Sequence, residues 1–145
     1  GVAALFGRAP VALDTVVFIY FIEEQPEYLR FVEPIFAAIA AGHLTAVTSA
    51  LTLLETLVVP YRAANLALAE RYEALLTRSR GLRLVTPEAP VLRVAAQLRA
   101  RFNVKTPDAI QIATALQAQA SAFVTYDRAL PSVPGLRTIL VSDLD

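Results

Sequence analysis

Four acidic residues stand in segments of the sequence that carry almost no other charge. Asp14 and Glu55 are each the only charged residue in a run of at least ten residues. Asp108 precedes an apolar run, and Asp127 follows another. An ionised carboxylate taken out of water costs several kcal/mol unless it is paired or bound to a cation. These four acids therefore require a positive partner, and basic residues are largely absent from their segments.

Clustered carboxylates at neutral pH favour one particular kind of partner. They repel one another, and a hard divalent cation relieves that repulsion. Mg²⁺ prefers carboxylate and water oxygens in octahedral geometry. The sequence has no cysteine and only one histidine, His43, so a thiolate site is excluded. The pattern predicts an oxygen-ligated metal site suited to phosphate chemistry.

Each acid taken alone also has a structural interpretation. Asp14 could cap the helix that follows it, and Asp108 could be a first-turn acid favoured by the helix dipole. Asp127 precedes Arg128 and could form a turn or a local ion pair. Glu55 is harder to explain in this way, because its helix is apolar on every side. Four such coincidences are needed to replace one metal site, so we favour the metal site.

The elements that must position these acids follow from apolar runs and helix signals. Ser49 is expected to cap the third helix, which should stop at Pro60, and Thr106 is expected to cap the last one, with Pro107 in its first turn. The predicted strands cover residues 11–14, 44–48, 82–86, 122–126 and 138–141. The predicted helices cover residues 15–22, 27–41, 50–60, 63–79, 87–101 and 106–120.

Strands that alternate with helices predict an α/β fold with a central, mostly parallel, five-stranded sheet between helices. In such sheets, ligands bind beyond the carboxyl ends of the strands. Asp14 and Asp127 end the first and fourth strands, Glu55 lies in the helix after the second, and Asp108 opens the helix before the fourth. If strands one, two and four are neighbours, the four acids converge on one edge of the sheet.

Length and composition indicate a single folded domain. The chain has 145 residues, and 56% of them are hydrophobic, with a mean hydropathy of +0.52. We expect one domain over residues 10–145 and treat residues 1–9 as a lead-in. The uncharged stretch 34–54 is interrupted by Gly42 and His43, so we expect no membrane span. No signal peptide is visible, and the cytoplasm is the expected location.

The charge balance does not favour a nucleic-acid ligand. The net charge is +0, with 13 basic and 13 acidic residues. Twelve of the basic residues are Arg, which suits bidentate contacts to phosphate. Arg99, Arg101 and Lys105 precede the Asp108 helix and either contact a phosphate backbone or are simply solvated helix residues. A binder of nucleic acid would have to rely on such local groups.

Four segments of the chain resemble PIN domains, and within them the VapC-type toxins of bacterial toxin–antitoxin pairs. The segments occur in the order expected for the family and extend over most of the chain. Each is weakly specific alone, and the ordered set is considerably more specific. They are ALDTVVFIYFIE (12–23), TSALTLLETLVVP (48–60), KTPDAIQIATAL (105–116) and FVTYDRAL (123–130).

The resemblance implies a three-layer α/β/α PIN-like fold and an endoribonuclease that uses Mg²⁺ or Mn²⁺. It also implies a homodimer and a cognate antitoxin that covers the active-site face. Carried over by position, it makes Asp14, Glu55, Asp108 and Asp127 the acidic metal-binding quartet. It further suggests Thr15, Ser49 and Thr125 as nearby hydroxyl helpers. The low basic charge departs from what is expected of an enzyme that acts on RNA.

The expected mechanism is attack of a metal-activated water on an RNA phosphodiester. Asp14, Asp108 and Asp127 would hold one or two ions, directly or through water. Glu55 would either ligate a metal or orient the attacking water. Thr125 and Ser49 would hydrogen-bond a ligand water or a carboxylate.

Other assignments fit the sequence less well. A haloacid-dehalogenase-like phosphatase needs a second acid two residues after Asp14, where Val16 stands. A phosphoacceptor receiver domain needs an Asp and a Lys after the third and last strands, where Pro87 and Ser142 stand. His43 is expected at the surface of a turn, which argues against histidine-based hydrolysis. The remaining alternative is a non-catalytic PIN-fold interaction or RNA-binding module, which need not bind Mn²⁺.

Overall fold

The protein is built around a parallel five-stranded sheet. The structure, a computed structural model, describes residues 2–144. The strand order is β3-β2-β1-β4-β5, and every pairing is parallel. The central strand, β1, pairs with both β2 and β4. The condition for convergence of the four acids, that the first, second and fourth strands are neighbours, is therefore met. The strands are β1 (Val11–Leu13), β2 (Ala46–Ser49), β3 (Leu82–Val85), β4 (Ala122–Thr125) and β5 (Thr138–Leu140).

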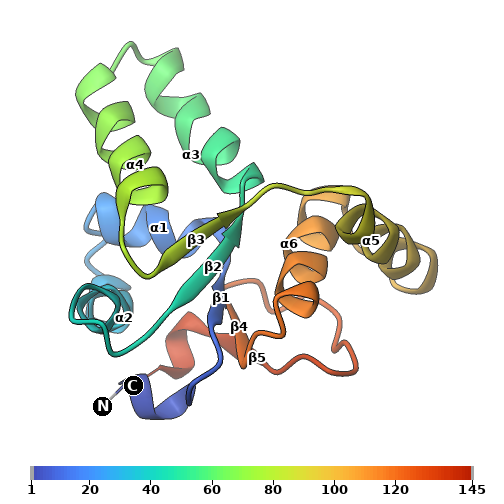
Figure 1. The fold of residues 1–145 in the computed structure, drawn as a ribbon. Coiled ribbons are helices and arrows are strands. Elements are labelled where there is room, and N and C mark those ends of the chain that lie inside the picture. The colour runs from blue at the N-terminus through green and yellow to red at the C-terminus, as the bar shows by residue number, and fades with distance from the viewer. Residues whose placement is uncertain (1, 145) are drawn as a thin grey trace.

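Helices cover both faces of the sheet, which confirms the expected three-layer α/β/α fold. In Figure 1, α1, α2 and α4 lie on one side of the sheet, and α5 and α6 lie on the other. Short 3₁₀ turns occur near each end of the chain, at Val2–Leu5 and Val141–Asp143. The helices are α1 (Thr15–Ile22), α2 (Leu29–Ala40), α3 (Leu51–Arg62), α4 (Leu66–Arg78), α5 (Ala89–Arg101) and α6 (Thr106–Gln117).

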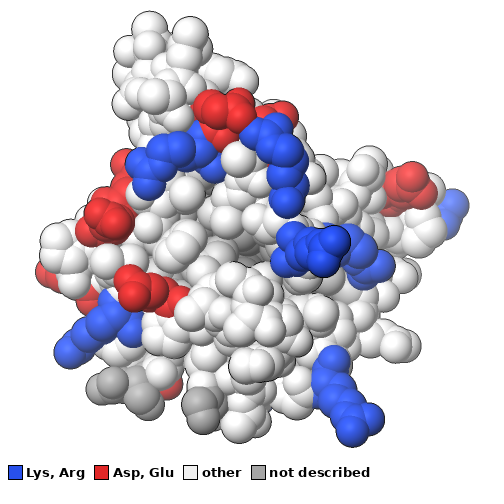
Figure 2. Space-filling view, turned by 60° about the vertical axis from the view of Figure 1, so that its left-hand side comes forward, with Lys and Arg blue, Asp and Glu red and all other residues white. Residues whose placement is uncertain are grey.

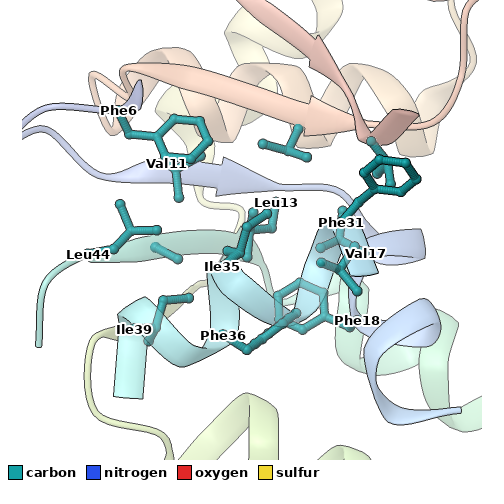
Figure 3. Close-up of a cluster of buried hydrophobic side chains, with 14 of the residues drawn as sticks. Phe6, Val11, Leu13, Val17, Phe18, Phe31, Ile35, Phe36, Ile39 and Leu44 are labelled. Atoms are coloured by element: carbon teal, nitrogen blue, oxygen red, sulfur yellow. The ribbon is translucent and has the colours of Figure 1, made fainter. Parts of the chain in front are cut away.

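Alternation along the strands divides the core into two layers. Val11 and Leu13 of β1 face α1 and α2, whereas Ala12 between them faces α5 and α6. Figure 3 shows the first layer, in which Phe18 and Phe36 meet edge to face with ring centroids 5.6 Å apart. Both faces of the sheet are therefore buried, as near-continuous apolar strands predict.

Helices α3 and α4 form a hairpin that extends away from the sheet (Figure 1). A small third cluster holds its base, where Leu57 and Tyr72 pack against Ile22 at the end of α1. Asn65 caps α4 by accepting a 3.2 Å hydrogen bond from the backbone N–H of Leu68. The hairpin positions Glu55, because that residue lies in the part of α3 nearest the sheet.

The first helix has the predicted bounds, and the other five differ from their predicted bounds by one to three residues at one or both ends. Two differences have a clear physical reason. Helix α3 does not stop at Pro60 but continues to Arg62, because a proline in the last turn removes only one backbone hydrogen bond and its ring is buried. Thr106 is not the cap of α6. It is the first helical residue, and its hydroxyl accepts a 2.9 Å hydrogen bond from Arg99 instead.

The uncharged stretch 34–54 is divided among three elements. It contains most of α2, a turn at Gly42 with a φ of 78°, strand β2 and the start of α3. His43 is exposed in that turn, as predicted. Within residues 2–144 no helix is both long and apolar enough to cross a bilayer.

Candidate metal centre

A cleft of about 570 Å³ opens at the carboxyl ends of the central strands. All four acids picked out from the sequence line it, and each is supplied by a different element. Asp14 follows β1, Glu55 lies in α3, Asp108 is in the first turn of α6, and Asp127 lies just beyond β4. The topology thus brings together four carboxylates that are up to 113 residues apart in the chain. Thr15, Val16, Ile19, Thr125, Tyr126 and Arg128 complete the lining.

Asp14 has a structural and an electrostatic role at once. Its Oδ1 caps α1 by accepting a 2.8 Å hydrogen bond from the N–H of Thr15, and its Oδ2 accepts one of 2.7 Å from the Thr125 hydroxyl. Burial raises the pKa of Asp14 to about 6, against the lowering effect of those two hydrogen bonds. The charges of Asp108 and Glu55 add to the rise. The fold therefore holds Asp14 where a nearby cation would favour its ionised form.

Asp108 belongs to the same electrostatic cluster. Burial raises its pKa, and the charges of Asp127 and Glu55 raise it further, while Lys105 acts in the opposite direction. Asp127 is placed by the turn after β4, where its Oδ1 accepts a 2.8 Å hydrogen bond from the N–H of Ala129. Repulsion between clustered carboxylates is expected from the sequence, and here it adds to the effect of burial on the pKa of Asp108.

Thr125 connects two of the acids. It is fully buried, donates to Asp14, and accepts a 3.2 Å hydrogen bond from the backbone N–H of Asp127. Ser49 lies elsewhere. Its side chain is buried, accepts a 3.1 Å hydrogen bond from the N–H of Leu51 at the start of α3, and does not line the cleft. Its hydroxyl therefore stabilises the helix that carries Glu55.

Glu55 is oriented by a buried polar network. Thr15 donates a 2.7 Å hydrogen bond to Oε1 of Glu55. Behind Thr15, the side-chain amide of Gln111 donates to Thr52 at 2.8 Å and lies 3.4 Å from the Thr15 hydroxyl. The carbonyl of Gln111 accepts a 3.3 Å hydrogen bond from the N–H of Ser49. Gln111 thus joins α6, α1, α3 and the end of β2.

The direction of each hydrogen bond in this network is fixed by counting protons, since a hydroxyl has only one to donate. Thr48 gives its proton to the carbonyl of Leu13 at 2.8 Å. Thr52 must then donate to Thr48, 2.7 Å away, and is left to accept from Gln111. Buried side-chain N and O atoms all have partners within residues 2–144. A fully satisfied network of this kind is rigid.

Gln111 and Thr52 are site residues that sequence reasoning missed. Gln111 is buried within an apolar helix, in the run AIQIATAL. The argument applied to the acids, that a polar group in an apolar segment needs a partner, would have identified it. Arg99 is also more structural than expected, because it bonds Thr106 and the carbonyl of Val104, at 3.1 Å.

The donor set determines which ions fit the cleft. Within residues 2–144 no three His, Asp or Glu side chains are already arranged to hold an ion. Mg²⁺ usually keeps several waters and takes one or two carboxylates together with phosphate oxygens of a substrate. Carboxylate and hydroxyl oxygens in an open cleft fit Mg²⁺ or Mn²⁺ bound partly through water. They do not fit a closed structural cage.

Only local basic groups, and no extended basic surface, are available on the face shown in Figure 2 to bind a polyanionic ligand. In the view of Figure 2, basic and acidic groups are interspersed, and no field of one sign covers the face. This agrees with the net charge of +0. Within the cleft itself Arg128 is the basic residue, and its guanidinium lies 3.4 Å from the Ser142 hydroxyl.

Comparison with known proteins identifies a family from the sequence. The sequence model of the PIN domain matches residues 11–136, which include every element from β1 to the loop before β5. All four acids fall within the matched range. No curated protein sequence matches the chain.

Solved structures provide an independent comparison of the fold. A toxin–antitoxin complex from Klebsiella pneumoniae is similar with a TM-score of 0.66 and 19% identity, covering 90% of this chain and 97% of that one. DNA-bound VapBC from Salmonella typhimurium has a TM-score of 0.64 and 22% identity, covering 92% and 98%. FitAcB from Neisseria gonorrhoeae has a TM-score of 0.63 and 18% identity, covering 92% and 99%. At these identities the likeness demonstrates a shared fold.

Proposed function

The chain belongs to the PIN-domain family, and from this premise we propose that it is a metal-dependent endoribonuclease and the toxin of a VapC-type toxin–antitoxin pair. The substrate is RNA, the cofactor is Mg²⁺ or Mn²⁺, and the reaction is hydrolysis of a phosphodiester bond. An RNA substrate in a bacterial cell places its action in the cytoplasm. The structural neighbours whose descriptions name toxin–antitoxin complexes support the toxin assignment.

The observation that carries the proposal is the convergence of four carboxylates in one cleft. Asp14, Glu55, Asp108 and Asp127 line it together, and the raised pKa values of Asp14 and Asp108 reflect burial and mutual repulsion. A structural role for each acid explains its local hydrogen bonds but not the convergence. A cation-dependent site explains both.

The residues of the cleft have different roles in the proposed reaction. Asp14, Asp108 and Asp127 would hold the cation, with Thr125 fixing Asp14 and the backbone of Asp127 in one arrangement. When bound, the divalent ion lowers the pKa of a coordinated water and neutralises charge on the phosphate. Glu55, held at Oε1 by Thr15, presents its other oxygen to orient the attacking water and accept its proton.

The proposed protein partners are a cognate antitoxin and a second copy of the chain. Large apolar side chains are exposed on α3 and at the start of α4, where Leu54 is 60% and Leu66 is 69% exposed, with Val58 and Val59 between them. Exposed apolar patches of this kind mark protein contacts. A cationic antitoxin segment that reaches the carboxylates would inhibit by compensating the same charges as the metal.

Cleavage of RNA by the purified chain tests the proposal. Total bacterial RNA is incubated with Mg²⁺ or Mn²⁺, with and without a chelator, alongside Asp14→Asn and the control Glu88→Gln, which removes an exposed carboxylate outside the cleft. We expect discrete fragments that require the metal, disappear with Asp14→Asn and persist with Glu88→Gln. Metal-independent cleavage, or full activity of Asp14→Asn, would contradict the proposal. Absence of both fragments and Mn²⁺ binding would favour the non-catalytic module.

A further inference from the structure

Three tyrosines meet beside the cleft, two from the region of the first two helices and one from a distant part of the sequence. Tyr20 lies in α1, Tyr28 directly precedes α2, and Tyr126 lies between the two site residues Thr125 and Asp127. Tyr20 and Tyr28 stack with ring centroids 4.3 Å apart and an interplanar angle of 21°. Tyr126 meets both edge to face, at 4.9 Å from Tyr28 and 5.9 Å from Tyr20.

These contacts hold the Tyr126 ring in one position while leaving it accessible. The hydroxyl of Tyr28 donates a 2.7 Å hydrogen bond to that of Tyr126. Tyr126 nevertheless remains 41% exposed. Ordering an exposed aromatic side chain costs conformational entropy, and a ring fixed in advance in this way binds a flat ligand with little further loss.

The cleft is lined by two chemically different kinds of side chain. One kind is the carboxylates, and the other is the apolar and aromatic side chains of Val16 and Ile19 of α1 and of Tyr126. The volume of the cleft, about 570 Å³, lies within the usual range for a small-molecule site of roughly 300–1,000 Å³. A site for metal and phosphate alone gives no reason for the apolar residues. A nucleotide supplies a partner for both kinds, because it carries an anionic phosphate and a flat base.

We propose that Tyr126, with Val16 and Ile19, forms a nucleobase subsite in which the base beside the scissile phosphate stacks on the Tyr126 ring. The proposal rests on the proposed function and narrows its substrate to RNA whose base is unpaired at this position. Bases splayed from single strands commonly stack on aromatic side chains, and such stacking tolerates many sequences. Tyr28 and Tyr20 act as positioning residues that hold the ring.

Binding of small phosphates in the presence of Mn²⁺ tests the subsite without requiring cleavage. The probes are adenosine 5′-monophosphate and ribose 5-phosphate, which differ only in the base, and affinities are measured by calorimetry. Tyr126→Ala removes the ring, Tyr126→Phe keeps it, and Tyr61→Ala is the matched control. Tyr61 is 58% exposed in α3 and does not line the cleft.

We expect the wild type to bind the nucleotide about tenfold more tightly than the sugar phosphate, as stacking of one base implies. That preference should vanish in Tyr126→Ala and persist in Tyr126→Phe and Tyr61→Ala. Equal affinities in the wild type, or a preference retained by Tyr126→Ala, would overturn the subsite. Metal-dependent cleavage of RNA with no base preference would show that the subsite fails while the proposed function stands. A base preference without any cleavage of RNA would support the subsite and contradict the proposed ribonuclease function.

Discussion

The hydroxyl of Thr15 donates a 2.7 Å hydrogen bond to Oε1 of Glu55. This bond joins the first residue of α1 to the middle of α3. Thr15 also follows Asp14 and donates its backbone N–H to that carboxylate. One residue thus sets the position of two of the four acids. The relationship makes Thr15 a test of whether the orientation of Glu55 matters to the site.

Replacing Thr15 should impair the site more than the fold. Thr15→Val removes the donor to Glu55 but keeps a side chain of similar shape, and we expect RNA cleavage to fall by roughly 10- to 100-fold, as is usual when a supporting hydrogen bond is lost. Thr15→Ser should restore most of the rate. Both rates are measured at saturating Mn²⁺ with thermal unfolding recorded in parallel. Wild-type activity of Thr15→Val would contradict the positioning role.

The pKa of Asp14 predicts how the stability of the metal-free protein depends on pH. Its folded value of about 6 lies above its ordinary value of 3.8, so protonation favours the folded state. The associated stability is fully present below about pH 4 and is lost as the pH rises through 6. A shift of this size corresponds to at most about 3 kcal/mol.

Asp14→Asn isolates that contribution, because the amide does not titrate. Urea denaturation with a chelator at pH 4 and pH 8 should show the wild type losing more stability between these values than the variant. The quantity compared is the loss of unfolding free energy between pH 4 and pH 8 in each of the two proteins. Equal losses would mean that Asp14 titrates normally in the folded protein.

Divalent metal should restore, at neutral and higher pH, the stability that the folded protein loses when Asp14 ionises. A ligand that binds only the folded state stabilises it by about 2.7 kcal/mol at 100 times its Kd. Mn²⁺ should therefore raise the melting temperature at pH 8, and do so much less at pH 5, where protons compete for Asp14. Thermal unfolding over a Mn²⁺ titration checks this. A shift that is the same at both values, or also present in Asp14→Asn, would place the ion elsewhere.

The buried network around Gln111 makes a prediction about stability. Thr52→Val leaves the amide of Gln111 without its 2.8 Å acceptor, and an unsatisfied buried donor costs about 1–3 kcal/mol. Thr114→Val is the matched control, because Thr114 is also buried but bonds only the Ile110 carbonyl one turn earlier. We expect Thr52→Val to be clearly the more destabilising in urea denaturation. Equal effects would mean that the network is not cooperative.

The sequence was sufficient to predict the three layers and the parallel sheet, because apolar periodicity and alternation of elements restrict an α/β chain to few arrangements. The strand order was not predicted. It also selected the four acids that line the cleft, since a lone charge in an apolar run is conspicuous. Boundaries were less predictable. The end of α3 beyond Pro60 and the position of Thr106 depend on tertiary partners, namely the residues that bury the Pro60 ring and the side chain of Arg99.

The polar and aromatic surroundings of the acids were not predicted, for a physical reason. Gln111 and Thr52 lie 59 residues apart, and only the folded structure shows that their side chains bond. Tyr28 and Tyr126 are 98 residues apart and look like ordinary surface aromatics in the sequence. Periodicity reports which face of an element is buried. It does not report which polar group on another element will meet it.

The most direct test of the central claim, that the carboxylates of the cleft bind a divalent cation, is a calorimetric titration of the purified protein with Mn²⁺ at pH 8. The wild type, Asp14→Asn, Asp108→Asn and the control Glu88→Gln are compared. We predict saturable binding that weakens by tenfold or more in each cleft variant and is unchanged in the control. Absence of binding by the wild type, or equal binding by all four proteins, would contradict the claim.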